Sequence, residues 1–266
     1  MRNEIDKAFE ITKKENRPAL ISFTVAGDNT KKKSLEILKS ISNTVDIAEW
    51  GMAFNCPGAD GPEIQNSSYR AIKNGITLDS TFLLIKKYKK IKNSKPLILM
   101  GYYQLIYNYG EKKFIKKCRD VGVAGLIVVD LPWPDNRSFA KLCKKNSICF
   151  VQLIAPTTTK KRMKLIVKDS HQLIYQVSNI NITGGKLKST AKTILNNYKT
   201  IKRIYPSKNV IIGFGITIDT ISNFKEANGL VVGSACCKVI SNAIKKRQNP
   251  AKKLNNMLLK LKTKIL

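Results

Sequence analysis

VDIAEWGMAFNCPGADGPEIQ, residues 45–65, is an apolar run followed by a loop, and comparable apolar runs recur along the rest of the chain. Its apolar run IAEWGM (47–52) contains one carboxylate, Glu49, and the loop that follows contains a second, Asp60. Only 18 Asp and Glu residues stand against 48 Lys and Arg residues, so an acid inside an apolar run is unusual here. We expect a β-strand to carry Glu49 to the mouth of a pocket and the loop to bring Asp60 over it.

The segment VDIAEWGM (45–52) is predicted as the second strand, and seven other apolar runs resemble it, each followed by a helical pattern. They are ALISFTV (19–25), PLILMG (96–101), AGLIVVD (124–130), ICFVQLIA (148–155), LIYQVS (173–178), NVIIGFG (209–215) and GLVVGSA (229–235). Continuous apolar runs are typical of parallel strands that are buried on both faces. Eight strand–helix units in 266 residues predict a single domain, residues 1–266, folded as a closed (β/α)8 TIM barrel.

Additional helices are predicted outside these eight units. Apolar residues at helical spacing predict a helix at 2–14, before the barrel, and two helices, near 65–73 and 79–91, after the second strand. A last amphipathic helix is predicted at 249–264. The segment DTISNFKEA (219–227) is predicted as the helix of the seventh unit, and it is short.

The formal net charge of +30 suggests an attraction to nucleic acid or to phosphorylated compounds. A compositional bias is the other interpretation, and it is favoured because the lysines are spread over nearly every predicted helix. A nucleic-acid interface needs its cations gathered on one face. We therefore expect no specific binding of nucleic acid, and a nucleic-acid-binding protein stays the less favoured alternative.

The six cysteines form no CxxC pair, and the chain has one histidine, His171, so no metal site is expected. The thiols are expected to be reduced, in the cytoplasm. The N-terminal segment lacks the apolar core of a signal peptide, and no apolar run approaches the ~20 residues that span a bilayer. We expect no membrane association.

Catalytic groups of such barrels lie at the carboxyl ends of the strands. Those positions hold Glu49, Asp60, Tyr102, Asp130 and Tyr175. Apolar neighbours would desolvate Glu49 and raise its pKa, which suits general acid–base catalysis. The alternative for such an acid is a structural carboxylate that accepts backbone hydrogen bonds, and we assign that role to Asp130. His171 lies at the other end of the barrel and is interpreted as structural.

Glycines gather at the ends of the last two strands and predict a phosphate site. Gly213 and Gly215 end the seventh strand, and Gly233 and Ser234 end the eighth, just before a helix. Glycines let backbone N–H groups approach an anion, and a helix N-terminus adds a favourable dipole. Thr183 and Gly184 are candidates for a third edge, while turn glycines remain the ordinary alternative.

Together these segments resemble one family over essentially the whole chain, the tryptophan synthase α chain. The matching blocks are FTVAGD (23–28), AEWGMAFNCPGADGPEIQ (48–65), MGYYQLIYNYG (100–110), GLIVVDLPWPD (125–135), LIAPTT (153–158), YQVSNINITG (175–184), GFGI (213–216) and GSACCKVI (233–240). The resemblance implies a retro-aldol cleavage of indole-3-glycerol phosphate to indole and glyceraldehyde 3-phosphate. That reaction needs neither a metal nor an organic cofactor in this chain.

The resemblance also implies residue roles. Glu49 matches the principal acid–base catalyst, Asp60 the carboxylate that holds the indole N–H, and Tyr175 a residue close to the reacting side chain. The phosphate cradle corresponds to the glycines above, with Thr183 and Ser234. The indole slot corresponds to Phe23, Met100, Ile127, Val129, Leu153 and Phe214. The implied partner is a pyridoxal-phosphate (PLP) β chain in an α2β2 heterotetramer, which receives indole through a tunnel.

This chain departs from the family pattern in its loops. An acid is replaced by Cys56 in the loop that faces the β chain in the family, and Asn181 replaces a glycine in the sixth loop. These changes motivate an alternative, a catalytically weakened subunit that mainly activates the β chain. The intact Glu49 and Asp60 argue against it.

Overall fold

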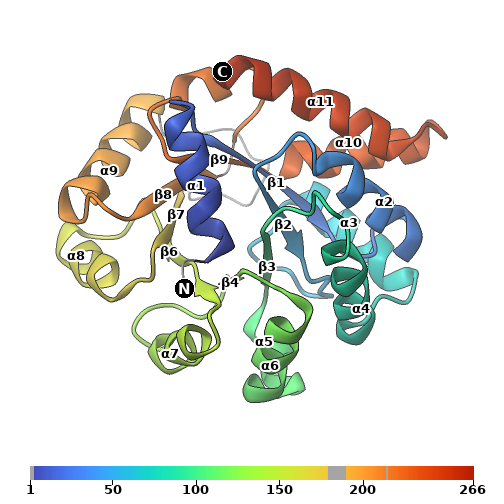
Figure 1. Ribbon diagram of the computed structural model, residues 1–266, viewed down its shortest axis with the longest axis horizontal. Coiled ribbons are helices and arrows are strands. Elements are labelled where there is room, and N and C mark those ends of the chain that lie inside the picture. Colours follow the sequence, from blue (N-terminus) through green and yellow to red (C-terminus); the bar gives the residue numbers. More distant parts are fainter. Residues whose placement is uncertain (1–2, 179–189, 214) are drawn as a thin grey trace.

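The computed structural model describes residues 3–178, 190–213 and 215–266. Its strands form one parallel sheet in the order β5-β4-β3-β2-β1-β9-β8-β7-β6, and helices surround this sheet (Figure 1). The strands are β1 (Ala19–Val25), β2 (Ile47–Gly51), β3 (Leu97–Gly101), β4 (Gly125–Val128), β5 (Cys149–Phe150), β6 (Gln152–Ile154), β7 (Leu173–Val177), β8 (Asn209–Gly213) and β9 (Gly229–Val232).

The predicted TIM barrel is confirmed, and its fifth strand is divided in two. β5 pairs with β4 and β6 pairs with β7, while Val151 between them belongs to neither strand. The segment 148–155, predicted as one strand, thus contributes a short strand to each edge of the sheet, where the barrel closes. All the ladders are parallel, as the continuous apolar runs predicted.

Outside the sheet, the described residues form eleven α-helices and one short 3-10 helix. They are α1 (Glu4–Lys14), α2 (Lys31–Ile41), α3 (Pro62–Lys73), α4 (Leu78–Lys89), α5 (Tyr103–Tyr109), α6 (Glu111–Val121), α7 (Arg137–Lys145), α8 (Lys160–Asp169), α9 (Ala191–Ile204), η1 (Ile221–Phe224), α10 (Ser234–Lys245) and α11 (Pro250–Ile265). The helices predicted before the barrel, after the second strand and at the end of the chain are confirmed as α1, α3, α4 and α11.

The predicted helix at 219–227 is wrong, because only the 3-10 turn η1 forms there. Side chains of the preceding segment bond to the backbone instead. The Thr220 hydroxyl donates to the Gly215 carbonyl at 2.8 Å and accepts from the Thr217 N–H at 2.9 Å. Local bonds of this kind compete with the helical pattern. Two smaller differences are α5, which had not been predicted, and α10, which already begins at Ser234.

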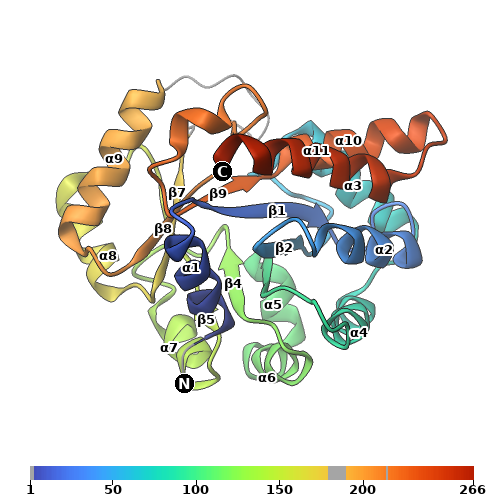
Figure 2. The same cartoon turned by 45° about the horizontal axis from the view of Figure 1, so that its top comes forward.

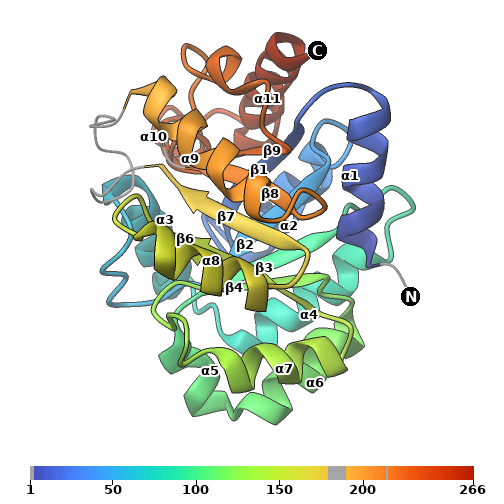
Figure 3. The same ribbon diagram turned by 90° about the vertical axis from the view of Figure 1, so that its left-hand side faces the viewer.

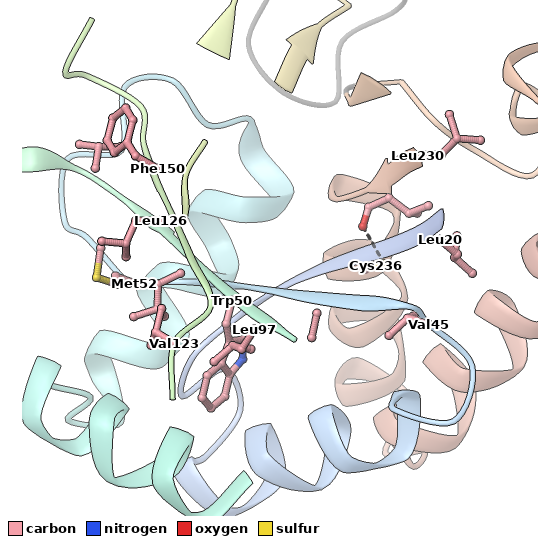
Figure 4. Close-up of a cluster of buried hydrophobic side chains, with 14 of the residues drawn as sticks. Leu20, Val45, Trp50, Met52, Leu97, Val123, Leu126, Phe150, Leu230 and Cys236 are labelled. Atoms are coloured by element: carbon pink, nitrogen blue, oxygen red, sulfur yellow. Dashed lines mark hydrogen bonds between the residues drawn. The ribbon is translucent and has the colours of Figure 1, made fainter. Parts of the chain in front are cut away.

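Side chains of the strands alternate between two apolar layers, as the strand period of two requires. In β2, Ile47 belongs to the cluster inside the barrel, while Ala48 and Trp50 belong to the cluster between sheet and helices. Figure 4 shows Trp50 in this outer cluster with Leu97. Trp50 is fully buried in this cluster. Glu49 lies between Ala48 and Trp50, so its side chain is directed into the barrel.

The two terminal helices pack at different parts of the barrel. α1 covers the end where the strands begin, and its N-cap Asn3 donates to the Ala124 carbonyl at 2.8 Å. In Figure 3 the arrow of β7 points away from α1. α11 lies across α2 and α10 (Figure 2), and its Asn255 accepts from the Thr44 hydroxyl at 2.7 Å. The other end of the barrel, where the strands finish, is left for the site.

Candidate active site

Glu49 lies inside the barrel, between two neighbouring strands. Phe23 of β1 and Ile98 of β3 are its register partners. Glu49 is 1% exposed, and within the described residues its Oε2 atom has no hydrogen-bond partner. Burial, and then the negative charge of Asp60, raise the pKa of Glu49 to about 8. At neutral pH the side chain is therefore mainly the neutral acid, ready to give a proton.

Asp60 reaches the same place from the loop that precedes α3. The loop is held by its own backbone, since the Asp60 N–H donates to the Pro57 carbonyl at 3.0 Å and Gln65 Nε2 donates to the Asp60 carbonyl at 2.8 Å. The Tyr102 hydroxyl donates to Asp60 Oδ2 at 3.1 Å. Burial raises the pKa of Asp60 to about 6, and the bond from Tyr102 acts in the opposite direction. Asp60 is thus mainly ionised at neutral pH.

Tyr175 faces the two carboxyl groups from β7. Burial, and then the charges of Glu49 and Asp60, raise the pKa of its hydroxyl well above the usual value. Its ring lies directly against the backbone of Gly213, where an added Cβ would come 1.9 Å from the hydroxyl oxygen. The carbonyl oxygen of Gly213 also accepts hydrogen bonds from the Ser178 N–H at 3.2 Å and from the Ser178 hydroxyl at 2.5 Å. The close approach of Tyr175 is therefore one reason for a glycine at position 213.

Two cavities meet at these side chains, and both are lined by Asp60, Met100 and Tyr175. The narrow one is further lined by Phe23, Glu49, Ile64, Gly215, Ile216, Val231, Gly233 and Ser234. The wide one, of about 490 Å³, extends outward over β4 to β6 and the start of α8. Its walls include Val129, Leu153, Trp133, Gln152 and Arg162.

The predicted phosphate residues are only partly brought together. Gly215, Gly233 and Ser234 line the narrow cavity, and Ser234 is the first residue of α10. The N-terminus of that helix therefore meets the cavity and provides a positive dipole end. Gly213 is not among the residues that line the two cavities. The predicted residues Thr183, Gly184 and Phe214 lie outside the described residues.

The predicted apolar slot divides between the two cavities. Phe23 lines the narrow cavity, Met100 lines both, and Val129 and Leu153 line the wide one. Ile127 lines neither of them, and is fully buried in the apolar cluster inside the barrel. Ile127 precedes Val129 by two positions on the same face of the chain, so it lies one layer deeper.

Tyr102 stands at the end of a predicted strand, and its sequence context predicts no role for it. The structure shows that it is the hydrogen-bond partner of Asp60. Trp133, Gln152 and Arg162 were also missed, because they join the wall of the cavity from three different elements. Asp130 Oδ1 accepts from the Tyr103 N–H at 2.7 Å, in agreement with its structural interpretation. His171 Nδ1 likewise accepts from the Phe150 N–H at 2.9 Å.

Across residues 3–178, 190–213 and 215–266, no group of three or more His, Cys, Asp or Glu side chains is arranged to hold a metal ion. None of the helices in these ranges combines the length and the apolar composition that a bilayer crossing requires. All six cysteines are free, and Cys56 is the exposed one.

The geometry favours acid–base chemistry on a ligand that has an apolar part and an anionic part. Near pH 7 Glu49 is neutral and can donate a proton, while Asp60 is ionised and can stabilise a positive charge. An apolar wall lies on one side of this pair. Backbone glycines and a helix N-terminus lie on the other.

Comparisons with known proteins show the family of the chain. The family model described as "Tryptophan synthase alpha chain" matches residues 9–265. The chain is 57% identical to the tryptophan synthase alpha chain of Pelagibacter ubique over 261 residues, which cover 98% of each protein. It is 35% identical to that of Thermoanaerobacter pseudethanolicus, over 92% of this chain and 94% of the relative.

A solved structure shows the same fold. The crystal structure of tryptophan synthase subunit alpha from Legionella pneumophila superimposes with a TM-score of 0.90 at 26% identity. The match covers 100% of this chain and 99% of the other. The chain therefore belongs to the tryptophan synthase alpha chain family, whose members are lyases of tryptophan biosynthesis.

Proposed function

We propose that this chain, as a tryptophan synthase α subunit, cleaves indole-3-glycerol phosphate to indole and glyceraldehyde 3-phosphate. The observation that carries the proposal is the pair of buried carboxyl groups with separated pKa values, about 8 for Glu49 and about 6 for Asp60. The reaction needs a proton donor and a fixed negative charge in the same pocket. Near pH 7 neutral Glu49 would be the proton donor, and ionised Asp60 would be the fixed negative charge.

The proposed step begins when neutral Glu49 gives its proton to the ring carbon that bears the side chain. Positive charge then develops on the ring, and ionised Asp60 stabilises it by accepting the ring N–H hydrogen bond. The bond between the ring and the side chain breaks, and its electron pair returns to the ring. The side-chain hydroxyl becomes the aldehyde as its proton passes to the Glu49 carboxylate. Glu49 thus ends the cycle protonated, as it began.

We propose binding roles for the remaining lining residues. Met100, Val129 and Leu153 would hold the apolar ring, with Phe23 beside Glu49. Gly215, Gly233 and Ser234 would receive the phosphate, because the N-terminus of α10 favours an anion there. The roles predicted for Tyr175, Gly213, Ile127, Thr183, Gly184 and Phe214 stay part of this proposal.

The wider assembly is proposed from the family. We expect the whole chain to act as one domain in the cytoplasm, without a cofactor of its own. Its partner would be a PLP-dependent β chain in an α2β2 heterotetramer, which receives the indole. A purely activating role is the less favoured alternative, since both carboxyl groups lie in the pocket.

An indole-release assay on the purified chain, with and without a β chain, tests the proposal. Glu49→Gln is expected to lower the rate by about 10²- to 10⁴-fold, the usual contribution of an acid–base group. Glu226→Gln is the matched control, because it makes the same chemical change at a carboxyl group that is 57% exposed. A wild-type chain that releases no indole in either condition, yet activates the β chain, would support the activating role instead.

A further inference from the structure

Tyr102 joins the loop of Asp60 to the end of β3. It follows β3 directly, is the N-cap of α5, and is only 7% exposed. Its ring stacks on Phe54 of the same loop, with centroids 5.0 Å apart and an interplanar angle of 26°. The position of the phenol is thus determined by packing on the ring as well as by the strand. Such support keeps a hydroxyl at a defined point.

The direction of the Tyr102 proton follows from its two partners. The Ala59 N–H donates to the Tyr102 oxygen at 3.0 Å, so that oxygen acts as an acceptor there. A phenol has one proton, and the remaining partner, Asp60 Oδ2 at 3.1 Å, accepts it when Asp60 is ionised. Consecutive residues of one loop, Ala59 and Asp60, therefore bind opposite sides of the same hydroxyl.

The charges around Asp60 make this bond important. Within the described residues, the titratable groups that face it are Glu49 from β2, Tyr175 from β7, Cys237 from α10 and Tyr102 itself. None of these is a cation. In the described part of the chain, burial raises the pKa of Asp60 and the Tyr102 bond lowers it. Asp130 acts on Tyr102 from the far side, as a further negative charge.

We propose that Tyr102 is a positioning residue that keeps Asp60 ionised and directed into the pocket by donating its only hydroxyl proton to Oδ2. Its effect on catalysis rests on the proposed function, while its effect on Asp60 does not. Tyr102 acts through Asp60 and leaves Glu49 as the proton donor. Removal of the hydroxyl should therefore shift the pKa of Asp60 and leave the pKa of Glu49 unchanged.

The test is Tyr102→Phe, which retains the ring and its stacking on Phe54. The ionisation of Asp60 is followed directly by NMR of ¹³C-carboxyl-labelled aspartate, with the signal identified by its loss in Asp60→Asn. We expect the midpoint of Asp60 to rise by about one pH unit, the usual value of a hydrogen bond to a charged group. The acid limb of the pH profile of kcat/KM should rise with it, and the alkaline limb should stay.

Tyr109→Phe is the matched control on the same helix. Its hydroxyl donates to the exposed carboxylate of Asp79 at 2.7 Å, so this variant also removes a tyrosine–carboxylate bond. Tyr109→Phe should shift neither the acid limb nor the alkaline limb of the pH profile of kcat/KM. An unchanged Asp60 midpoint in folded Tyr102→Phe would overturn the inference. A wild-type chain without indole release would overturn the proposed function alone, because the NMR titration needs no turnover.

Discussion

Glu49 and Asp60 line the same narrow cavity, and the negative charge of Asp60 helps to raise the pKa of Glu49. One comes from a barrel strand and the other from the loop that follows it. The effect of Asp60 on Glu49 adds to that of burial, the larger cause. The charge of Asp60 thus favours the neutral form of Glu49.

The pH dependence of indole release should follow both groups. Asp60 must be ionised to stabilise positive charge, so activity should fall as the pH decreases through about 6. Glu49 must be protonated to act as the acid, so activity should fall as the pH rises through about 8. We expect a bell-shaped profile of kcat/KM with a maximum between these values. Continued activity far above the upper limit would contradict the role of Glu49 as proton donor.

Glu49→Gln should make the fold more resistant to alkaline pH. The pKa of Glu49 rises from 4.5 to about 8 on folding, so between these values the native chain holds more protons than the unfolded chain. The stability contributed by neutral Glu49 is complete below about 4.5, declines as the pH rises, and is lost once the pH passes about 8. Glutamine is uncharged at every pH, so it avoids this loss.

Urea unfolding at pH 5 and at pH 8.5 measures the effect. The wild-type chain should lose a few kcal/mol more than Glu49→Gln between the two conditions, as linkage requires for a strongly raised carboxyl pKa. Glu226→Gln again serves as the control, because its carboxylate is exposed. Parallel changes in all three proteins would show that Glu49 does not titrate with a raised pKa.

Gly213→Ala should displace Tyr175. The added Cβ would lie 1.9 Å from the Tyr175 hydroxyl oxygen and 2.3 Å from the adjacent ring carbon, so the ring must move. We expect a loss of at least about tenfold in indole release, since active-site groups tolerate little displacement.

A double-mutant cycle shows whether Tyr175 causes the loss. With Tyr175→Ala the side chain that clashes is absent, so adding Gly213→Ala should have little further effect on unfolding free energy or on activity. Additive losses in the double variant would mean that position 213 acts by another route, such as the contacts of its carbonyl with Ser178.

Much of the barrel was predictable because its information is local. Eight apolar runs with helical segments between them predicted the parallel sheet, and the order of the runs placed Glu49 on the second strand. Errors arose where tertiary packing or side-chain bonds overrode the local pattern. Val151 divides the fifth strand, and Thr217 with Thr220 replaces the seventh helix by a 3-10 turn.

By itself, the sequence determined which residues face inward and which carboxyl groups stand at the ends of the strands. Alternation along a strand is a property of the backbone, so it follows from the order of residues. Only the tertiary structure decided how those groups meet. The Tyr102–Asp60 bond joins residues 42 positions apart, and burial by several strands sets the pKa of Glu49. Distances and desolvation of this kind depend on elements that are far apart in the chain, so they appear only when the barrel closes.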